Sequence, residues 1–424
     1  MDNSSQTHGV VGLGYVGLPL ALAMSKSGFD VIGVDIDKER VDMLANGTSY
    51  ITDVSDEEVT KGLEQGFEPT TEYDDLSSID SVSICVPTPM RKTGSPNLSY
   101  VSAAADSLED VIPEKTTVIL ESTVYPGATE EMVAGPLTEN GWEIGEDVFV
   151  AFSPERIDPG NEEYGPTDIP KVLGGVTQAG GDRAQAIYEQ VFDQVVRVDS
   201  AKEAELVKLL ENTFRAVNIG LINEMAQVAH RLDADIWNVI DAAKTKPFGY
   251  MPFYPGPGLG GHCIPVDPMF LSWQANQQGI DTEFIDLADQ VNREMPEFVV
   301  SRVIDLLNAE SVPVPDANVL ILGTAYKPNV SDTRESPAFD IISELEDRDA
   351  TIAYTDPYVP AFEVVGTSYE SVELTSDRLD WADIVIILTD HDDFDIEWVV
   401  EESSLLFDTR NATADLDSES VYKL

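Results

Sequence analysis

The stretch Gly12-Leu13-Gly14-Tyr15-Val16-Gly17 lies between an apolar run and a segment of helical composition, and it decides the fold. The apolar residues before it predict a β-strand, and the leucine-rich residues after it predict a helix that ends near Gly28. A second apolar strand, residues 31–34, ends at Asp35. Glycines at this spacing permit a tight turn and let backbone N–H groups approach a pyrophosphate at the helix N-terminus. The stretch therefore predicts a dinucleotide-binding unit.

Asp35 indicates which dinucleotide is bound. It lies about 20 residues beyond the glycines, where a carboxylate accepts the ribose hydroxyls of NAD and disfavours the 2′-phosphate of NADP. Arg40 follows closely and is placed to contact the adenine or the ribose. We therefore expect NAD as the cofactor. The expected cofactor-binding residues are Gly12, Gly14, Tyr15, Val16, Gly17, Asp35 and Arg40, with Pro87, Thr88 and Thr123 from loops after two later strands.

The charge of the chain is extreme. Among 424 residues, Asp and Glu number 78 and Lys and Arg number 25, which gives a net charge of −53. A surface this negative repels phosphate backbones and anionic lipid, so we expect no nucleic-acid partner and no membrane. The hydrophobic fraction of 42% is normal for a folded protein and argues against acidic disorder. A carboxylate-coated surface suits molar salt, where ions screen self-repulsion, and predicts a halophilic source.

The cysteines and the apolar runs exclude further classes of protein. Two cysteines, Cys85 and Cys263, rule out a disulfide framework and a multi-cysteine metal site, and we expect no metal. No apolar run approaches the ~18 residues of a membrane span. The first residues, MDNSSQTHG, lack the basic and apolar regions of a secretory signal. These features predict a cytoplasmic enzyme.

Later strands and helices predict three regions. Short apolar strands at 81–86, 117–120 and 148–152 alternate with helices, which indicates a doubly wound parallel sheet. Residues 202–232 carry apolar residues at helical spacing and predict one long helix. A Pro-rich linker near residue 313 opens a second α/β region. We expect an α/β protein with an NAD-binding Rossmann domain at 1–200, a central helical connector at 201–310 and a Rossmann-like domain at 311–424.

The glycine-rich loop that contains Cys263 is the most informative stretch for chemistry. Its sequence is Gly258-Leu259-Gly260-Gly261-His262-Cys263-Ile264-Pro265-Val266-Asp267-Pro268, so the cysteine is accessible to a substrate. A thiolate is a nucleophile, and Asp267 is placed to polarise a water or to orient the sulfur. An inert loop cysteine is the plainer interpretation of Cys263 alone, but an NAD site in the same chain favours catalysis. Cys85, inside an apolar strand, is expected to be a buried core thiol.

Residues on the long helix and after two strands have the chemistry of a site. Lys208 and Asn212 share one helix face and suit an oxyanion or a water, although a solvated Lys and a packed Asn are the common alternative. Thr123, Glu155 and Arg156 follow strands, at the sheet edge where α/β sites form. Loop or cap roles are the alternative for each of these three residues.

Two cations follow a strand of the second α/β region. Lys327 and Arg334 stand out in an acidic chain, and they suit an anionic substrate such as a diphosphate. Surface ion pairing with Asp332 and Glu335 is the alternative interpretation.

Together these motifs resemble the UDP-sugar 6-dehydrogenases over nearly the whole chain. The resemblance is closest to the N-acetylhexosamine branch, in the stretch Phe152-Ser153-Pro154-Glu155-Arg156 and in the cysteine loop. UDP-glucose enzymes usually carry Ser in place of His262 and an Arg before the loop, whereas this chain has no Arg between Arg231 and Arg293. The resemblance implies a UDP-N-acetylhexosamine as substrate. Its loops favour N-acetylglucosamine, while N-acetylmannosamine and UDP-glucose stay open.

The chemistry that the resemblance implies is a four-electron oxidation of the sugar C6 alcohol by two NAD⁺. The cysteine forms a thiohemiacetal and then a thioester, and water releases the uronate. The implied catalytic residues are Cys263, Lys208 and Asn212 for the oxyanions, Asp267 with Thr123 for water and protons, and Glu155 for thioester hydrolysis.

The resemblance also implies a UDP-binding surface and an assembly. The C-terminal domain would bind UDP, and the chain would form a homodimer or a larger homo-oligomer through the long helix. The product would be a uronic acid for a surface glycan or glycoprotein. The implied substrate-binding residues are Glu155, Arg156, Lys208, Asn212, Tyr254, Gly260, Lys327 and Arg410.

Two other functions fit part of this pattern. A two-electron hydroxyacid dehydrogenase shares the Rossmann domain and the Lys–Asn helix, but it needs neither Cys263 nor a second α/β region. A non-catalytic nucleotide-sugar-binding protein has no chemical reason to keep Cys263, Lys208, Asn212 and Asp267 together.

Overall fold

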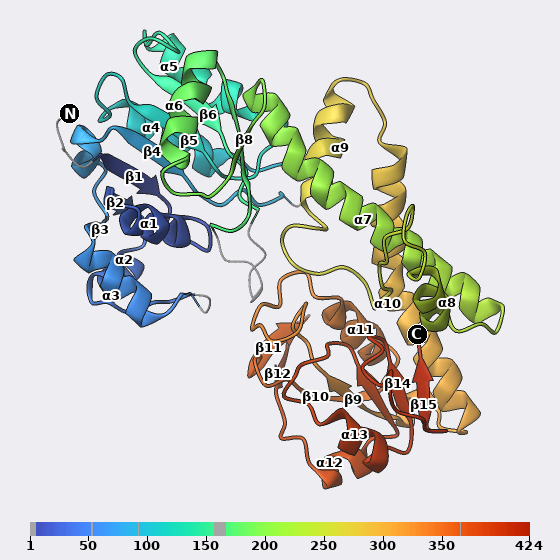
Figure 1. The fold of residues 1–424 in the computed structure, drawn as a ribbon. Helices are drawn as coiled ribbons and strands as arrows, with labels where there is room; N and C mark the ends of the chain where they lie inside the picture. The colour runs from blue at the N-terminus through green and yellow to red at the C-terminus, as the bar shows by residue number, and fades with distance from the viewer. Residues whose placement is uncertain (1–5, 52–53, 92, 157–166, 365) are drawn as a thin grey trace. The chain divides into compact units, whose positions relative to one another are not determined.

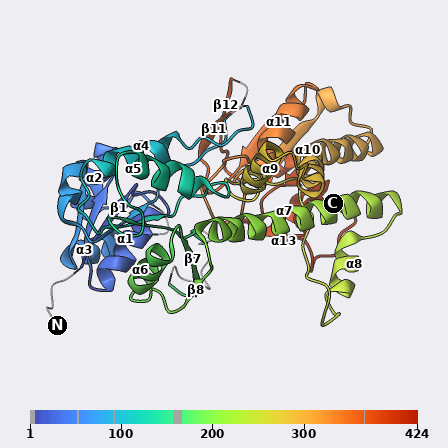
Figure 2. The ribbon, with the colours of Figure 1, turned by 90° about the horizontal axis from the view of Figure 1, so that it is seen from above.

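The computed structural model describes residues 6–51, 54–91, 93–156, 167–364 and 366–424 (Figure 1). The chain divides into two units, Met1–Glu211 with Trp273–Ile280 and Asn212–Ser272 with Asp281–Leu424. Helix α7, Ala201–Arg231, begins in the first unit and ends in the second. Figure 2 shows it as one unbroken helix. The long helix predicted at 202–232 is therefore confirmed.

The first unit is built on an eight-stranded sheet in the order β3-β2-β1-β4-β5-β6-β7-β8. Neighbouring strands are parallel except β6 and β7, which are antiparallel. This is the doubly wound sheet that the sequence predicts. Its strands are β1 Thr7–Val11, β2 Asp30–Val34, β3 Phe67–Thr70, β4 Ser81–Ile84, β5 Thr117–Leu120, β6 Phe149–Phe152, β7 Lys171–Gly175 and β8 Val195–Arg197; its helices are α1 Gly17–Lys26, α2 Lys38–Ala45, α3 Asp56–Glu64, α4 Ser99–Glu109, α5 Gly135–Glu139 and α6 Gln178–Tyr188, with short turns of helix at Tyr73–Ser78 and Glu130–Ala134.

The strand predicted at 81–86 is too long, because β4 ends at Ile84. The Cys85 N–H still donates to the Val11 carbonyl at 2.7 Å, but Pro87 has no N–H with which to extend the ladder. The side chain of Cys85 is 8% exposed and belongs to the apolar core of this unit. The prediction that Cys85 is a buried core thiol is therefore confirmed.

The second unit contains a five-stranded parallel sheet in the order β10-β9-β13-β14-β15, with a separate β11–β12 hairpin. Alternate residues of β9 pack in different apolar clusters, Val319 in one and Leu320 in the other, as the pleat requires. The predicted second α/β region is confirmed. The elements are α8 Ile236–Ala243, α9 Asp267–Gln277 (which crosses into the first unit), α10 Glu283–Ala309, a short helical turn Val314–Asp316, β9 Asn318–Leu322, α11 Pro337–Glu346, β10 Thr351–Thr355, β11 Ala361–Val364, β12 Thr367–Glu370, α12 Ser376–Trp381, β13 Ile384–Ile387, α13 Ile396–Glu402, β14 Leu406–Asp408 and β15 Val421–Lys423.

The apolar face of α7 remains exposed in this chain. Phe214, Leu221, Met225 and Val228 recur along one side of the helix and are 41–55% exposed. The helical spacing in the sequence predicts such a face correctly. The spacing predicts that the face is apolar. It does not predict which tertiary or quaternary contact buries the face.

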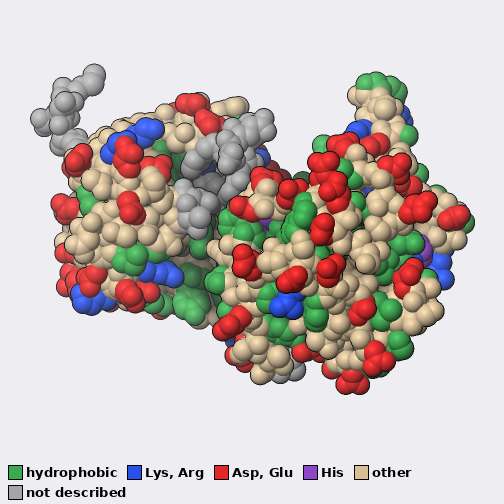
Figure 3. Space-filling view, turned by 90° about the horizontal axis from the view of Figure 1, so that it is seen from below, with side chains coloured by type: hydrophobic (Ala, Val, Ile, Leu, Met, Phe, Trp, Pro, Cys, Tyr) green, Lys and Arg blue, Asp and Glu red, His purple; other side chains and the backbone are tan. Residues whose placement is uncertain are grey.

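The surface is dominated by carboxylates. Figure 3 shows Asp and Glu side chains scattered over the face in view, with few Lys and Arg side chains among them. Among the helices that the described ranges contain, none has the length and apolar character needed to cross a membrane.

Candidate active site

The predicted glycine turn lies between β1 and α1, and its three glycines have different surroundings. Gly12 has φ +91°, and a Cβ placed on it would lie 2.7 Å from the carbonyl oxygen of Cys85. A Cβ on Gly17 would lie 1.8 Å from the carbonyl oxygen of Gly12. A Cβ on Gly14 would meet no atom within 4 Å. Internal packing therefore requires Gly12 and Gly17, whereas Gly14 borders open space through which a pyrophosphate can approach the backbone.

Asp35 follows β2 and is buried beside this turn. One carboxylate oxygen accepts from the Leu13 N–H at 2.9 Å, and the other accepts from the Asp37 N–H at 2.9 Å. A guanidinium nitrogen of Arg40 lies 3.8 Å from the first oxygen. Each carboxylate oxygen can accept more than one hydrogen bond, so Asp35 keeps capacity for ribose hydroxyls. These residues fit the adenosine half of NAD, with Gly14 free for the phosphates.

The other predicted cofactor residues lie at the carboxyl ends of neighbouring strands. Tyr15 is half-exposed in the turn after β1. Pro87 and Thr88 follow β4, and the half-buried Thr123 follows β5. Strands β1, β4 and β5 are adjacent in the sheet, so their carboxyl ends share one edge. This is the edge at which ligands bind in open α/β sheets.

A buried ionic cluster extends this edge, and the sequence does not predict it. The Lys171 ammonium of β7 lies 2.6 Å from a carboxylate oxygen of Glu121 and 2.8 Å from one of Glu155. The Tyr188 hydroxyl of α6 donates to the other oxygen of Glu121. Burial alone would lower the pKa of Lys171, but the two carboxylates outweigh burial and raise it. Burial raises the pKa of Glu121, against the opposing effect of Lys171.

Arg156, predicted to bind substrate, makes structural contacts in the first unit. Its guanidinium donates to both carboxylate oxygens of Glu211 on α7, at 3.1 and 2.6 Å. It also donates to the Pro170 carbonyl at 2.8 Å. These contacts tie the segment after β6 to the start of α7.

In the second unit, Cys263 is half-buried in its loop, directly before α9. The Asp267 N–H donates to the Cys263 carbonyl at 2.8 Å. The Asn212 amide donates to the Asp267 carboxylate at 2.6 Å, and both of these side chains are buried. The sequence predicts Cys263, Asn212 and Asp267 separately, and the structure joins the last two by a direct hydrogen bond. Lys208 lies one turn earlier on α7 and belongs to the first unit.

A pair of buried asparagines, which the sequence does not predict, holds the chain just before the cysteine loop. Asn223 of α7 accepts from the Gly256 N–H at 3.0 Å and donates to Asn292 of α10 at 2.9 Å. Asn292 in turn donates to the Ala216 carbonyl at 3.2 Å. A Cβ on Gly260 would lie 2.6 Å from the Cβ of Tyr326, so a glycine is needed there for packing.

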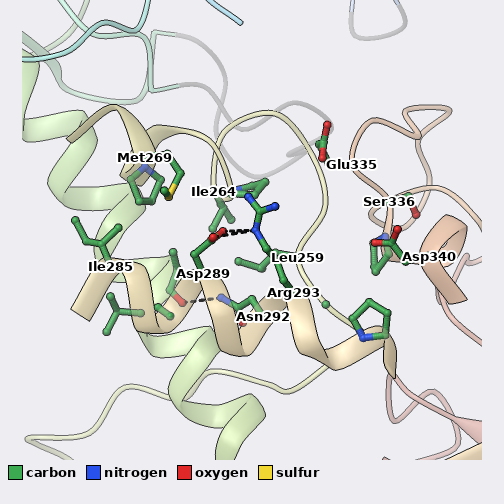
Figure 4. Close-up of a pocket in the computed structure, with 18 of the residues that line it drawn as sticks. Leu259, Ile264, Met269, Ile285, Asp289, Asn292, Arg293, Glu335, Ser336 and Asp340 are labelled. Carbon is green, nitrogen blue, oxygen red and sulfur yellow. Dashed lines mark hydrogen bonds and ion pairs between the residues drawn. The ribbon is translucent and has the colours of Figure 1, made fainter. Parts of the chain in front are cut away.

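A cavity of about 310 Å³ lies against the same loop, within the second unit (Figure 4). Leu259, Ile264 and Met269 contribute apolar side chains, and Figure 4 shows the ion pair between Arg293 and Asp289 of α10 beside them. Cavities of this size accommodate small ligands.

The predicted UDP-binding residues lie in the loops of the second unit. Arg410 follows β14, and its guanidinium donates to the Leu388 carbonyl at 2.7 Å. A Cβ on Gly256 would lie 2.7 Å from that guanidinium, so Arg410 contacts the chain just before the cysteine loop. Burial lowers the pKa of Arg410 to about 10, and the group stays cationic at neutral pH. Tyr254 is half-exposed and stacks on Trp237, with 6.3 Å between ring centroids.

Lys327 follows β9, as predicted, but Arg334 is engaged by Asp332. The Arg334 guanidinium donates to both Asp332 carboxylate oxygens, to Oδ1 at 2.9 Å and to Oδ2 at 2.5 Å. This ion pair is the alternative that the sequence left open for Arg334.

Comparisons with known proteins agree with this geometry. Residues 6–192 match the NAD-binding domain of the UDP-glucose/GDP-mannose dehydrogenase family, residues 202–294 match its central domain, and residues 320–415 match its UDP-binding domain. The three matches span most of the chain in the order that the fold shows.

Individual relatives match this chain over most of their length. The chain is 34% identical to the UDP-N-acetyl-D-mannosamine dehydrogenase of Pyrococcus horikoshii over 92% of this chain and 90% of that protein. It is 37% identical to the UDP-N-acetyl-D-glucosamine 6-dehydrogenase of Pseudomonas aeruginosa over 83% of each chain. A solved UDP-D-ManNAc dehydrogenase structure from P. horikoshii superposes with a TM-score of 0.89, at 30% identity and 99% coverage of each chain. The protein therefore belongs to the UDP-glucose/GDP-mannose dehydrogenase family and is an NAD-dependent UDP-sugar dehydrogenase.

Proposed function

We propose that this enzyme oxidises the C6 alcohol of a UDP-N-acetylhexosamine to the uronate, with Cys263 as the covalent nucleophile. The observation that carries the proposal is the cysteine loop. Cys263 lies in a glycine-rich loop, and its backbone carbonyl accepts a hydrogen bond from the Asp267 N–H. The side-chain amide of Asn212 donates to the Asp267 carboxylate at 2.6 Å. A thiol, a carboxylate and an amide in this arrangement suit acyl chemistry, which a two-electron alcohol dehydrogenase does not need.

The proposed reaction passes through two intermediates on Cys263. The sugar C6 loses a hydride and its hydroxyl loses a proton, which gives an aldehyde. The thiolate adds to the aldehyde carbon and the oxygen takes up a proton, forming a thiohemiacetal. Loss of a second hydride and of that proton gives a thioester. NAD⁺, when bound, accepts the hydride at each oxidation.

Residues of both units have roles in this proposal. Lys208 and Asn212 stabilise negative charge on the substrate oxygen. Asp267, with Thr123, positions water and takes up protons. Glu155 assists the last step, in which water adds to the thioester, the C–S bond breaks and Cys263 leaves as the thiolate.

The substrate proposal rests on the cysteine loop and on the relatives. His262 stands where UDP-glucose enzymes usually have Ser, and the chain has no Arg between Arg231 and Arg293. The relatives above carry the names of N-acetylmannosamine and N-acetylglucosamine enzymes. UDP-glucose is the alternative substrate, and oxidation rates with the two N-acetylated epimers identify the preferred sugar.

The UDP moiety would lie against the C-terminal domain. The cationic Arg410 supports this, because it contacts the chain at Gly256 and complements a diphosphate. Lys327 supplies a second cation, and Tyr254 and Gly260 line the approach in this proposal. We assign NAD binding to 1–200, assembly and the cysteine loop to 201–310, and UDP binding to 311–424.

The enzyme is proposed to work as a homodimer or larger homo-oligomer in high salt. The exposed apolar side chains of α7 support self-association, because a folded protein rarely leaves such a face in water. The net charge of −53 supports a halophilic origin, since molar salt screens the repulsion between copies. The uronate would serve a surface glycan or glycoprotein.

The variant Cys263→Ala tests the covalent mechanism. We expect no uronate from it, while NAD binding measured by titration stays within about twofold of the parent. Cys85→Ala removes the other thiol of the chain, which lies in the core, and serves as the matched control. Uronate formation by Cys263→Ala at the parent rate would remove the thioester from the mechanism.

A further inference from the structure

Lys171 joins two carboxylates that arrive from different strands of the first sheet. Glu121 follows β5, Glu155 follows β6, and the ammonium lies 2.6 Å from the first and 2.8 Å from the second. The side chain of Lys171 is 4% exposed, that of Glu121 is 0% exposed and that of Glu155 is 11% exposed. Of these three side chains, that of Glu155 is the most exposed.

We propose that Lys171 is a positioning residue for Glu155, which keeps the Glu155 carboxylate ionised and correctly oriented for thioester hydrolysis. This inference rests on the proposed function, in which Glu155 assists thioester hydrolysis, and it assigns the proton of the attacking water to Glu155. The oxygen of that water bonds to the acyl carbon, the C–S bond breaks, and the electron pair returns to the sulfur of Cys263.

The geometry holds both oxygens of Glu155 in place. One oxygen accepts from Lys171, and the other accepts from the backbone N–H of Arg156 at 2.6 Å. A carboxylate that accepts two such bonds cannot rotate freely, and its charged form is favoured over its neutral form. A catalytic base needs this kind of fixed orientation to contribute its full effect.

Glu121 and Tyr188 hold Lys171 in turn. The Tyr188 hydroxyl donates to Glu121 and lies 3.0 Å from the Ser83 hydroxyl, which lies 3.1 Å from the His8 ring. Burial lowers the pKa of His8 to about 3, so His8 is neutral at physiological pH. Lys171 is thus the cation of this network within the part of the chain that the structure describes.

A purely structural ion pair would need only one carboxylate. Glu121 alone compensates the charge of Lys171, and a buried ion pair adds little stability beyond that compensation. Glu155 is a second carboxylate on the same ammonium, and its side chain is the more exposed of the two. A second carboxylate in a largely buried cluster is costly for a core and suits a base, which argues that Glu155 is present for chemistry.

The groups that face Glu155 determine how it responds to pH. Among the described residues, Lys171 of β7, Glu121 after β5 and Cys85 after β4 interact electrostatically with Glu155, and Tyr188 of α6 interacts with Glu121. Burial raises the pKa of both Cys85 and Tyr188, so neither ionises near neutral pH. Between two variants that both keep Asp267, a difference in the pH profile of hydrolysis therefore reports on the members of this cluster that differ or respond, Lys171, Glu121 and Glu155.

The test compares two variants, because Lys171→Met alone leaves two carboxylates facing each other and is expected to fold poorly. In the double variant Lys171→Met/Glu121→Gln the inner ion pair is gone, and Glu155 alone keeps its charge. Glu121→Gln is the reference, and Lys61→Met, at an exposed lysine of α3, is the matched control. Rapid mixing follows NADH release, and intact-mass spectrometry follows the acyl-enzyme on Cys263.

The expected result separates the oxidations from hydrolysis. Relative to Glu121→Gln, the double variant should accumulate acyl-enzyme and hydrolyse it about tenfold or more slowly at neutral pH, with its pH profile displaced. The burst of NADH that precedes hydrolysis should persist, and Lys171→Arg should restore part of the hydrolysis rate. Hydrolysis at the reference rate with an unchanged pH profile would overturn the proposal for Lys171. Release of only one NADH per sugar by the parent protein, with no acyl-enzyme on Cys263 in any of the variants, would instead contradict the proposed function.

Discussion

Asp35 and Asp356 occupy equivalent positions in the two large sheets of this chain. Each follows the second strand of its unit, and each accepts the N–H of the residue after a positive-φ glycine: Leu13 at 2.9 Å and Thr324 at 2.6 Å. The other oxygen of each carboxylate accepts an N–H two residues further on, at 2.9 and 2.8 Å. The two α/β units of the chain therefore share the same hydrogen-bonding pattern in the turn that follows their first strand.

The partners of the two carboxylates explain why their roles differ. His391 lies 3.2 Å from Asp356, and the Ala325 N–H donates to the same oxygen at 3.0 Å. These contacts saturate Asp356 and close its side of the turn. Asp35 has Arg40 at 3.8 Å, and it keeps room for a ribose. Asp356 is therefore not available to the ribose of a dinucleotide in the way that Asp35 is. This agrees with the match of residues 320–415 to a UDP-binding domain.

Replacing Asp35 tests the choice of cofactor. In Asp35→Ala the ribose loses a charged acceptor, so the KM for NAD should rise about ten- to a hundredfold, from the ~1.5–3 kcal/mol of such a bond. Discrimination against NADP should weaken at the same time, because the carboxylate no longer repels the 2′-phosphate. Initial rates with both cofactors measure this. A parent enzyme that prefers NADP would refute the interpretation of Asp35.

Two alanine substitutions in the glycine turn should have opposite signatures. Gly12→Ala places a Cβ 2.7 Å from the Cys85 carbonyl at φ +91°, so it should lower the melting temperature, with ~1–2 kcal/mol lost from the backbone alone. Gly14→Ala meets no protein atom within 4 Å, so it should fold normally and weaken NAD binding. Calorimetry and NAD titration on both variants separate the effects. Normal NAD affinity in Gly14→Ala would show that the pyrophosphate does not approach there.

Asp356 should make the second unit sensitive to acid. Burial opposes its ionisation, but hydrogen bonds from His391 and from backbone N–H groups outweigh burial and lower its pKa to about 2. A lowered carboxylate pKa stabilises the fold above the unfolded value near 4, and that stability is lost as the pH falls towards 2. Asp356→Asn should reduce stability on the order of 2 kcal/mol at neutral pH and flatten the acid side of the curve. The measurement is melting temperature against pH in molar salt.

Asp380→Asn, on the exposed side of α12, provides the control for this experiment. Its acid curve should follow that of the parent. An Asp356→Asn curve that also follows the parent would mean that Asp356 contributes nothing to acid stability.

The exposed face of α7 should mediate self-association. Leu221→Lys with Met225→Lys places charges on this face, and it should weaken assembly about tenfold or more if these residues are interfacial anchors. Light scattering coupled to size exclusion in molar salt reports the mass. Asn308→Lys, exposed on α10, adds the same charge away from that face. An unchanged mass in the double variant would exclude this part of α7 as the interface.

The sequence predicts the parts whose signals are local. The glycine turn, the strands, the length of α7 and the contrast between Cys85 and Cys263 follow from periodicity and from neighbouring residues. Contacts between side chains that are far apart in the sequence do not follow from local patterns. Lys171 meets Glu121 across 50 residues, and Asn223 meets Asn292 across 69. Such pairs depend on strand order and helix packing, which no local pattern contains.

Arg334 is a case in which a local signal in the sequence suggests a role that the structure does not support. Its charge in an acidic chain suggests a ligand, yet both carboxylate oxygens of its neighbour Asp332 accept hydrogen bonds from its guanidinium. A side chain two residues away decides this outcome, and the choice between partner and ligand depends on loop conformation.

The most direct test of the central claim is the number of NADH formed per UDP-sugar consumed. The assay is run in high salt with UDP-N-acetylglucosamine, UDP-N-acetylmannosamine and UDP-glucose in parallel. The proposed four-electron mechanism predicts two NADH per sugar, with an N-acetylated sugar preferred, and the better of the two epimers identifies the substrate. Two NADH from UDP-glucose alone would keep the mechanism and replace the substrate. One NADH per sugar would contradict the account, because Cys263 would then carry no thioester.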